Sequence, residues 1–562
     1  MMRFLTLLLM FSLAWYSLQA QKVHYFQFRI ADTDELRSIT RMISIDDVRG
    51  KVVYAYATGE QMEQFVEKTS YDVQHLPITG LKNQKPTSVA SELSEWDAYP
   101  TYEQYEAMMD SMASAHPAIC DLDTIGYSLR GRRLLIMRIT DHIDREEDEP
   151  ELFYTSTMHG DEVVGYVLML RLIDTLLTSY GRDERITRLV DSIDIFINPN
   201  ANPDGTYAGG DQTLSGASRY NAHGVDLNRN FPDPQDGPHP DGFDWQPETR
   251  AMMDFAEQQH ITLSANFHGG TEVANYPWDT WSRPHADDPW LKYISRIYAS
   301  TAQENSPAGY FSVLTSSGTT RGYDWYPISG GRQDYMTYFH QAREVTMEIS
   351  DDKMPPASTL PDYWNYNREA LLRYMEECLH GIRGVVSDQW GHPLEAMVEV
   401  VGHDQEQDSS MIFTDPDVGD YHRMIDTGSY DLRFSAPGYR DTVVRDVSVK
   451  KGQANCIDVD MKRIVQSSVE EIGPINRFIC YPNPFHQWLR VEVDLRREVE
   501  GFAIEVVDLQ GRIVRTLKKS YANPGLNHFN LRWSNPSLLP GVYYIRIRTD
   551  SQTLTRKLLH LN

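Results

Sequence analysis

Apolar and polar positions along residues 95–381 predict strands and helices in alternation. Short apolar runs predict strands at 134–139, 151–158, 193–198, 262–267 and 344–349. Apolar residues at helical spacing predict helices at 101–116, 163–179, 247–259 and 363–379. Pro247 suits the start of the third helix, because the first helical position has no N–H bond to lose. This alternation indicates an α/β domain.

Two strand-rich regions follow the α/β domain. Residues 382–463 contain short strands between Gly, Pro and Asp turns, which predict a β-sandwich. A polar linker at 464–480 leads to a second strand-rich unit at 481–562. The sequence therefore predicts two small all-β units after the α/β domain.

A smaller α/β unit is predicted before the main domain, at residues 21–92. Its predicted strands are 23–30 and 52–57, and its predicted helices are 34–43 and 59–68. The polar stretch 80–94 is typical of a linker. No cluster of catalytic residue types is evident in this unit.

Composition and charge indicate the cellular compartment of the protein and exclude some classes of partner. Residues 1–20 have a basic start, an apolar middle and a small final residue, which is typical of a secretory signal peptide. That apolar run is too short for a comfortable membrane span, and no other run is long enough. The net charge of −27 argues against nucleic acid or an anionic membrane as a partner. The four cysteines form no C-x-x-C pair, so neither a disulfide scaffold nor a zinc knuckle is expected.

One turn carries a candidate metal-binding pair. His159 and Glu162 lie three residues apart, between a predicted strand and a predicted helix. An imidazole and a carboxylate held in this way supply two positions around one divalent metal. The same spacing recurs at His392/Glu395 and at His403/Glu406. Those two copies have no helix behind them and are interpreted as solvated loop residues.

Two further residues complete a catalytic hypothesis. His268 ends a predicted strand and is followed by two glycines, the position where open α/β sheets place functional side chains. With His159 and Glu162 it forms the His₂Glu set of a catalytic zinc, with water in the fourth position. Glu348 lies inside a predicted strand, where a carboxylate either faces solvent or serves a site. Beside a zinc-bound water it would act as general base.

A loop rich in arginine offers groups for a substrate carboxylate. Arg219, Asn228 and Arg229 lie close together in the sequence. A guanidinium grips a carboxylate through two parallel hydrogen bonds, and a second arginine can stabilise an oxyanion.

At this point the chain resembles zinc metallocarboxypeptidases of the carboxypeptidase N/E (regulatory) subfamily. The motifs are His159-Gly-Asp-Glu162, Asn198-Pro-Asn-Ala-Asn-Pro-Asp-Gly205, Gly224-Val-Asp-Leu-Asn-Arg-Asn-Phe-Pro-Asp233, Pro247-Glu-Thr-Arg-Ala251 and Leu263-Ser-Ala-Asn-Phe-His-Gly-Gly270. The resemblance covers roughly residues 99–462. It implies a mixed sheet with helices on both faces, then a transthyretin-like β-sandwich, one zinc ion, and peptide or protein C-termini as substrates.

The resemblance also implies roles for individual residues. His159, Glu162 and His268 resemble the zinc ligands, and Glu348 resembles the general base. The substrate-facing residues it implies are Arg219 for the oxyanion, Asn228 and Arg229 for the terminal carboxylate, Tyr326 as a closing tyrosine, and Asp279 and Gln333 in a pocket for Lys or Arg. Arg332, beside Gln333, departs from this pattern, because its charge would weaken a preference for basic residues if it pointed inward.

The C-terminal unit resembles a type IX secretion sorting domain, which implies the secretion machinery of a Gram-negative bacterium as a partner. The motifs are Tyr481-Pro-Asn-Pro-Phe485, Val507-Asp-Leu-Gln-Gly-Arg512, Leu539-Pro-Gly-Val-Tyr-Tyr544 and Arg556-Lys-Leu-Leu559. A generic adhesive β-sandwich is the alternative. Residues 21–92 resemble the amino-terminal regions of some bacterial carboxypeptidases, and a pro-segment, a chaperone or an accessory module all remain open.

Two other functions compete with a secreted carboxypeptidase. One is a catalytically inactive surface protein that only binds peptides, against which the intact His₂Glu set and Glu348 argue. The other is a peptidoglycan-peptide hydrolase on a related fold. The arginine clamp and the appended sandwich favour ordinary peptide C-termini.

Overall fold

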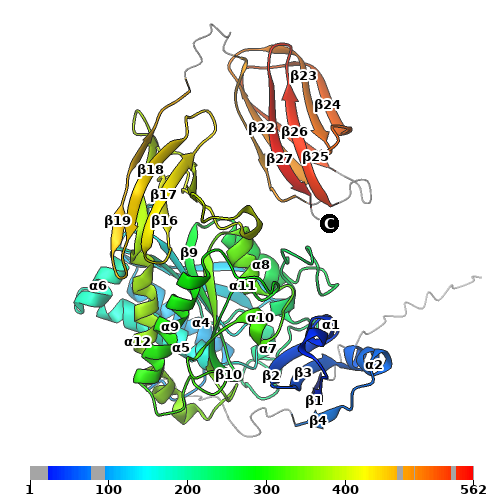
Figure 1. The fold of residues 1–562 in the computed structure, drawn as a ribbon, viewed down its shortest axis with the longest axis vertical. Helices are drawn as coiled ribbons and strands as arrows, with labels where there is room; N and C mark the ends of the chain where they lie inside the picture. Colours follow the sequence, from blue (N-terminus) through cyan, green and yellow to red (C-terminus); the bar gives the residue numbers. More distant parts are fainter. Residues whose placement is uncertain (1–22, 78–94, 465–472, 486–487, 533–539, 561–562) are drawn as a thin grey trace, which may run out of the picture. The chain divides into compact units, whose positions relative to one another are not determined.

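The computed structural model describes residues 23–77, 95–464, 473–485, 488–532 and 540–560 (Figure 1). The predicted signal peptide and the polar stretch 80–94 lie outside the described residues, as does part of the linker at 464–480. The chain divides into two compact units, Met1–Arg463 and Ile464–Asn562, and each is described by itself.

An eight-stranded mixed sheet forms the centre of the first unit, in the order β11-β10-β12-β9-β7-β8-β6-β5. The strands are β5 Cys120–Tyr127, β6 Arg133–Ile139, β7 Glu151–Ser156, β8 Asp194–Asn198, β9 Ile261–His268, β10 Thr271–Tyr276, β11 Thr319–Arg321 and β12 Arg343–Ser350. Neighbours from β8 through β7 and β9 to β12 run parallel. The pairs β5/β6, β6/β8 and β10/β12 are antiparallel. All five strands predicted in this domain are confirmed.

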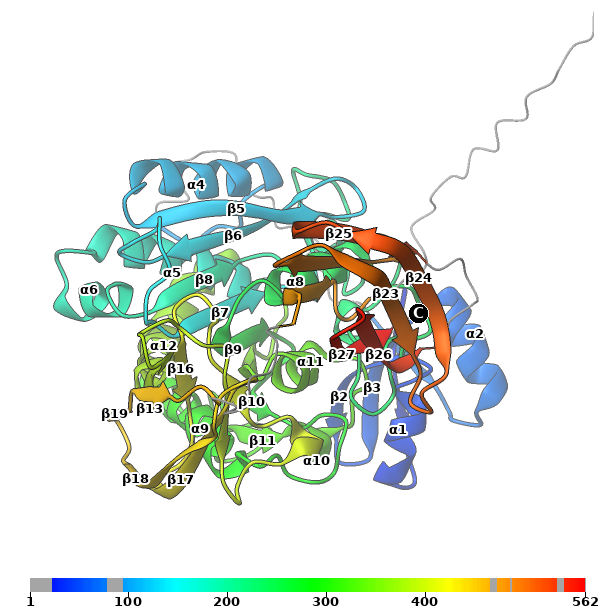
Figure 2. The same cartoon turned by 90° about the horizontal axis from the view of Figure 1, so that it is seen from above.

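Helices cover both faces of this sheet (Figure 2). On one face a large apolar cluster joins the sheet to α4 Tyr102–Ala115, α5 Val164–Ser179, α6 Glu184–Val190, α9 Asp288–Glu304 and α12 Leu360–Glu376. On the other face, α8 Pro247–Ala256 and α11 Arg332–Phe339 pack in a separate cluster with Phe153 and Phe196. Because α5 is buried along most of its length, its apolar residues are not confined to one stripe.

A β-sandwich follows α12 in the same unit. One sheet pairs β13 Gly381–Asp388 with β16 Asp420–Arg423, β19 Ala454–Cys456 and β20 Val459–Met461. The other contains β14 Met397–Val400, β15 Ile412–Phe413, β17 Gly428–Ser435 and β18 Thr442–Val449. The two sheets enclose one apolar cluster, as alternating strand residues require.

The second unit is also a sandwich of two sheets. The strands are β21 Ile475–Tyr481, β22 Trp488–Leu495, β23 Val499–Val507, β24 Ile513–Ala522, β25 Gly525–Arg532, β26 Gly541–Arg548 and β27 Thr553–His560. One sheet has the order β21-β22-β25 and the other β24-β23-β26-β27, around a common apolar core. The predicted fold class, an α/β domain followed by two all-β sandwiches, is therefore confirmed.

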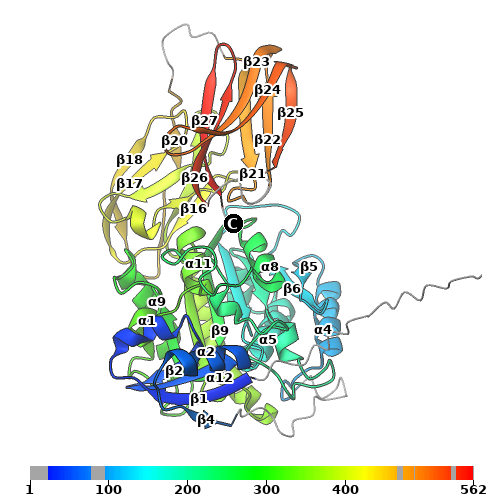
Figure 3. The ribbon, with the colours of Figure 1, turned by 90° about the vertical axis from the view of Figure 1, so that its right-hand side faces the viewer.

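Residues 23–77 form a small α/β layer, here called the N-terminal module (Figure 3, blue). Its elements are β1 Val23–Arg29, α1 Leu36–Ile39, β2 Ser44–Arg49, β3 Val52–Thr58, α2 Gly59–Lys68 and β4 Gln74–Leu76. The sheet order is β2-β3-β1-β4. The helix predicted at 34–43 is too long, because a 3₁₀ turn at Thr33–Glu35 precedes a single turn of α1 and the chain then turns into β2.

Candidate metal centre and substrate site

Two neighbouring parallel strands bring the candidate metal ligands together. His268 is the last residue of β9, and His159 follows the end of β7 by three residues. Because β7 and β9 are parallel and Ser156 is in register with Phe267, both strands end at the same edge of the sheet. Glu162 lies in the turn between His159 and α5. The topology therefore brings His268 to the local pair His159 and Glu162, although His268 lies more than one hundred residues later in the sequence.

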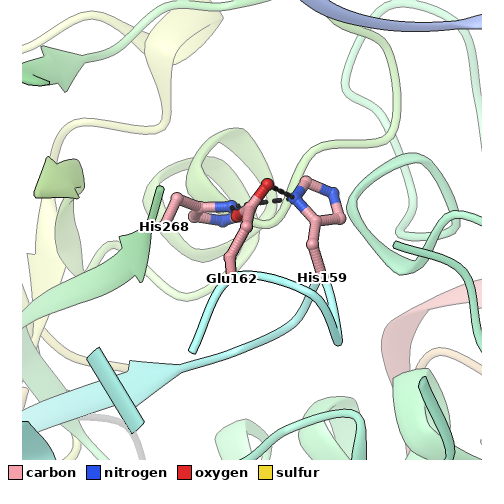
Figure 4. A group of neighbouring side chains, drawn as sticks. All are labelled: His159, Glu162 and His268. Carbon is pink, nitrogen blue, oxygen red and sulfur yellow. Dashed lines mark hydrogen bonds and ion pairs between the residues drawn. The ribbon is translucent and has the colours of Figure 1, made fainter. Parts of the chain in front are cut away.

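Figure 4 shows the three side chains pointing toward one another. His159 Nδ1 lies 3.0 Å from Glu162 Oε1, and His268 Nδ1 lies 2.8 Å from Glu162 Oε2. The two Nδ1 atoms are 3.0 Å apart, and all three residues are buried. Two ring nitrogens and a carboxylate, converging without solvent, are the donors that zinc takes in hydrolases. The residues present therefore fit a zinc ion.

Asp226 sets the proton position on His159, and sequence reasoning gave it no role. His159 Nε2 lies 3.0 Å from Asp226 Oδ1. A carboxylate there accepts the Nε2–H, so the lone pair of Nδ1 faces the metal position. Burial opposes ionisation of Asp226, but Arg219 and His159 hold its pKa well below the usual range. Asp226 could have been found from the sequence, because it lies between Arg219 and Asn228 in the motif Gly224–Asp233.

Glu348 lies beside His268 because β12 runs parallel to β9 with these two residues in register. Its Oε2 is buried and has no hydrogen-bond partner among the described residues. Burial, and then the charge of Glu162, raise the pKa of Glu348 well above its ordinary value. A carboxylate of this kind is poised to take a proton from a group placed between it and the metal ligands.

Arg219, Asn228 and Arg229 lie around the same centre. Arg219 Nη1 lies 3.4 Å from Glu162 Oε1, and its Nε donates to Asp226 Oδ2 at 3.0 Å. Asn228 lies in the short 3₁₀ helix Leu227–Arg229, which begins directly after Asp226. The Oδ1 atom of Asn228 accepts the backbone N–H of Arg332 at 2.9 Å. These contacts fix an arginine next to the candidate metal ligands and an amide beside it.

Asp279 is a buried acid with two amide partners. Asn275 Nδ2 and Gln333 Nε2 each donate to Asp279 Oδ1 at 3.2 Å. A Cβ at Gly322 would fall 1.6 Å from that oxygen, so only glycine leaves room for the carboxylate. Burial raises the pKa of Asp279 to about 7.

Arg332, the departure from the family pattern, points away from Asp279. Its Nη2 pairs with Glu344 Oε2 at 2.9 Å, its Nη1 donates to Thr155, and the guanidinium lies 4.8 Å from the ring centroid of Phe153. Its positive charge is therefore matched by Glu344.

One cavity joins most of the predicted site residues. Those on its lining are His159, Glu162, Arg219, Asn228, His268, Asp279, Tyr326 and Glu348. Arg229 and Gln333 are buried next to these residues and do not line the cavity. Gln333 instead orients Asp279, since its Oε1 accepts the Thr346 N–H at 2.8 Å while its Nε2 donates to the acid.

The two other His-x-x-Glu copies lie in the first β-sandwich, away from this centre. His392 pairs with Asp388 at 3.1 Å, and His403 pairs with Asp287 at 2.8 Å. His392 is solvated, as interpreted from the sequence, whereas His403 contributes to a buried ion-pair group around Asp287.

The fold and the converging His₂Glu group define a class, the zinc-dependent hydrolases. The sequence matches three families along its length: zinc carboxypeptidase at 105–370, carboxypeptidase regulatory-like domain at 381–462, and secretion system C-terminal sorting domain at 479–560. The chain belongs to the zinc carboxypeptidase family and is a zinc metallocarboxypeptidase.

Curated relatives include proteins of mammals and of a plant. Carboxypeptidase M of Mus musculus is 35% identical over 355 residues, which cover 61% of this chain and 79% of the relative. The catalytic chain of carboxypeptidase N of Homo sapiens is 34% identical, with 64% and 84% covered. Carboxypeptidase SOL1 of Arabidopsis thaliana is 34% identical, with 66% and 73% covered. In the described part of the chain, no helix has the length and apolar character to span a bilayer.

Proposed function

We propose that this chain is a secreted enzyme that removes single C-terminal residues, preferably Arg or Lys, from peptides and proteins. One observation carries the proposal. A buried carboxylate oxygen of Glu348, which has no hydrogen-bond partner in the part of the chain that the structure describes, lies on the same cavity as the converging His159, Glu162 and His268. A hydrolase needs a base and a metal group in one closed space.

Each residue in this proposal has a physical task. Zinc held by such a set supplies Lewis-acid chemistry, polarising a carbonyl and lowering the pKa of water. Glu348 takes the proton of the attacking water and delivers it to the leaving amine. Arg219 stabilises the negative charge that develops on the carbonyl oxygen. Asn228 and Arg229 bind the terminal carboxylate, and Tyr326 closes over the substrate.

The domain division and the route of export belong to the same proposal. We infer a peptidase domain at 95–381, a transthyretin-like domain at 382–463 and a sorting domain at 481–562. The sorting family match at the C-terminus supports passage to the surface or medium through a type IX system. A signal peptide at 1–20 would direct the chain to the periplasm first.

The two competing functions would each need only part of this set of residues. A protein that only binds peptides would not need a carboxylate at Glu348, and Glu348 lies in register with His268. A peptidoglycan-peptide hydrolase would not need a clamp for an ordinary terminal carboxylate. The arginines therefore favour free C-termini of peptides.

Zinc dependence is tested by replacing His268 with Ala. Loss of one of three ligands is expected to lower bound zinc well below one ion per chain and to abolish hydrolysis of blocked dipeptides ending in Lys, Arg, Phe or Glu. Metal content is measured by mass spectrometry, and a chelator should inactivate the wild type. His260→Ala, an exposed histidine just before β9, is the matched control. Full metal and full turnover in His268→Ala would refute the assignment.

The sorting function is tested by deleting residues 481–562. The two units have separate apolar cores, so the remaining chain is expected to fold and bind zinc. It should accumulate inside the cell envelope, as measured by fractionation. Full-length Glu348→Gln is the control, because it should be delivered normally although inactive. Normal delivery of the truncated chain would remove the sorting role.

A further inference from the structure

A second cavity lies at the other end of the central sheet, where the peptidase region meets the first β-sandwich. It holds about 90 Å³, which is room for several water molecules. Its wall combines the first residues of β7, β8 and β9 with β15, β16 and the loop between these two strands. We call it the junction cavity, because the peptidase region and the sandwich both contribute to its wall.

The junction cavity is separate from the candidate metal centre. Strand β9 begins with Ile261 on the wall of the junction cavity and ends with the candidate metal ligand His268. At about 3.3 Å per residue, a strand of eight residues puts its two ends about 23 Å apart. A small ligand in one site therefore cannot touch the other.

Glu151 gives the junction cavity its chemistry. It is 7% exposed, and its Oε2 is buried with no hydrogen-bond partner in the described part of the chain. Its neighbour is Asp194, because the first residues of the parallel strands β7 and β8 are in register. Burial, and then the charge of Asp194, raise the pKa of Glu151 well above its ordinary value. A buried carboxylate is stable in its charged form only when a cation pairs with it.

The positive side chains of the chain itself are committed elsewhere. Each arginine on the wall already pairs with another acid: Arg138 with Asp194, Arg343 with Asp287, and Arg145 with Glu147. Arg138 meets one oxygen of Asp194 twice, through Nε at 2.9 Å and Nη2 at 2.7 Å. None of these guanidinium groups can neutralise Glu151 without leaving a buried or paired acid behind.

Two more acids face the same space. Glu149 Oε2 accepts from Thr140 Oγ1 at 3.4 Å, and among the described residues no arginine or lysine pairs with it. Asp415 comes from the sandwich, and its Oδ1 accepts the backbone N–H groups of Asp417 and Val418 at 2.6 Å and 3.1 Å. Carboxylates from both parts of the first unit therefore line one cavity, and Glu151 is the most buried of the three.

This arrangement favours an organic cation over a metal ion. Ca²⁺ takes about six to eight oxygen ligands at about 2.3–2.6 Å. The compact groups of acids and histidines in the described residues do not include Glu151. An ammonium or guanidinium group needs only one or two carboxylate oxygens, and the junction cavity has the volume for its carbon atoms.

We propose that the junction cavity binds a small organic cation, a guanidinium or primary ammonium compound, whose N–H groups donate to Glu151. The acids Glu149 and Asp415 on the same wall add to the attraction. Such a ligand contacts the peptidase region and the sandwich at once, so it stabilises the folded first unit. The site does not depend on the proposed peptidase activity, because binding is measured without a substrate.

The test titrates agmatine, which carries a guanidinium and an ammonium group, into the full chain by calorimetry. Saturable binding is expected in the wild type. Glu151→Gln keeps the shape of the side chain and removes its charge, so the affinity should fall at least tenfold. Glu304→Gln, an exposed residue at the end of α9, is the matched control and should change nothing. No saturable binding in the wild type, or an equal affinity in Glu151→Gln, overturns the proposal.

A further variant separates the junction cavity from the pocket around Asp279, which would also attract a guanidinium group. Asp279→Asn should keep the binding that Glu151→Gln loses, and this outcome supports the proposal whether or not the chain hydrolyses peptides. Loss of binding in Asp279→Asn together with full binding in Glu151→Gln would place agmatine in the other pocket and overturn the proposal.

Other probes identify the class of cation. Tetramethylammonium carries the charge without N–H groups, so it should bind the wild type at least tenfold more weakly than agmatine. Arginine differs from agmatine by its α-carboxylate. Tighter binding of arginine would assign the site to free basic amino acids, and tighter binding of agmatine to amines without a carboxylate; each result supports the site. Equal affinities for tetramethylammonium and agmatine would overturn it.

Asp415→Asn tests the sandwich side of the cavity in case Glu151→Gln does not fold. The amide keeps an oxygen for the backbone N–H groups and removes the charge, so the affinity for agmatine should fall at least threefold. Asp417→Asn, an exposed residue of the same loop, is the matched control. An unchanged affinity in Asp415→Asn also overturns the proposal.

Discussion

Replacing Glu348 with Gln is expected to lower kcat by about 10²–10⁴-fold, the usual contribution of a positioned general base. The amide keeps the size of the side chain and cannot accept the proton. Glu348 lies in register with His268, and its Oε2 has no partner among the described residues, so the substitution breaks no observed contact of that oxygen. Zinc content and substrate binding should therefore remain close to those of the wild type.

The measurement compares kcat, KM and metal content of Glu348→Gln with those of Glu304→Gln. Glu304 is exposed at the end of α9, so its substitution should change none of the three. Near-normal kcat in Glu348→Gln would show that another group is the base. Loss of zinc would show that Glu348 helps to hold the metal.

The central site could be predicted because it depends on strand topology. His159 and His268 each follow an apolar strand, and neighbouring parallel strands end at one edge of a sheet. Glu348 was singled out by alternation within its strand and by the family resemblance, whereas its place beside His268 follows from the parallel pairing of β12 with β9. Short polar motifs at strand ends are recognised from neighbouring residues in the sequence, so they can be predicted without the structure.

Helix α9 shows a signal that was present and not used. Its buried residues include Trp290, Leu291, Ile294 and Tyr298, which recur at helical spacing. The helix at Asp288–Glu304 could therefore have been predicted from the pattern alone. It covers one face of the sheet beside β10 and β12.

The contacts of β2 could not be predicted in this way. Ser44, Asp46 and Asp47 give the strand a polar character, and their partners lie in the peptidase region rather than in solvent. The pairing of Asp46 with Lys353 joins residues 307 positions apart. Such contacts depend on how two surfaces of the folded chain pack together, and a pattern of neighbouring residues does not predict that packing. Lys353 was missed for the same reason.

Asp279→Ala is expected to lower kcat/KM for a substrate ending in Arg by about 30-fold or more and to leave that for Phe nearly unchanged. Asp279 lines the cavity and is buried, so a guanidinium that reached it would form a desolvated ion pair. Removing one partner of such a pair costs about 2–5 kcal/mol. An apolar side chain forms no such pair, so the substitution removes no contact that a substrate ending in Phe uses.

The pH dependence of the preference follows from the same carboxyl group. With a pKa of about 7, Asp279 is largely neutral at lower pH and becomes ionised as the pH rises through that value. Only the ionised form attracts a guanidinium, so the ratio of kcat/KM for Arg to that for Phe should rise about tenfold from about pH 6 to about pH 8. Taking the ratio cancels groups that serve both substrates, including Glu348.

The decisive comparison measures this ratio in the wild type, Asp279→Ala, Asp279→Asn and Asp324→Ala. Asp279→Asn keeps the shape and the amide contacts and removes the charge, so it should lose both the Arg preference and its pH dependence. Asp324 is exposed and pairs with Arg321 on the surface, so its loss should change neither. A wild type that prefers Phe, or a ratio that Asp279→Ala leaves unchanged, would show that another part of the cavity selects the side chain. Because the charge of Arg332 is paired with Glu344, it should not oppose the preference.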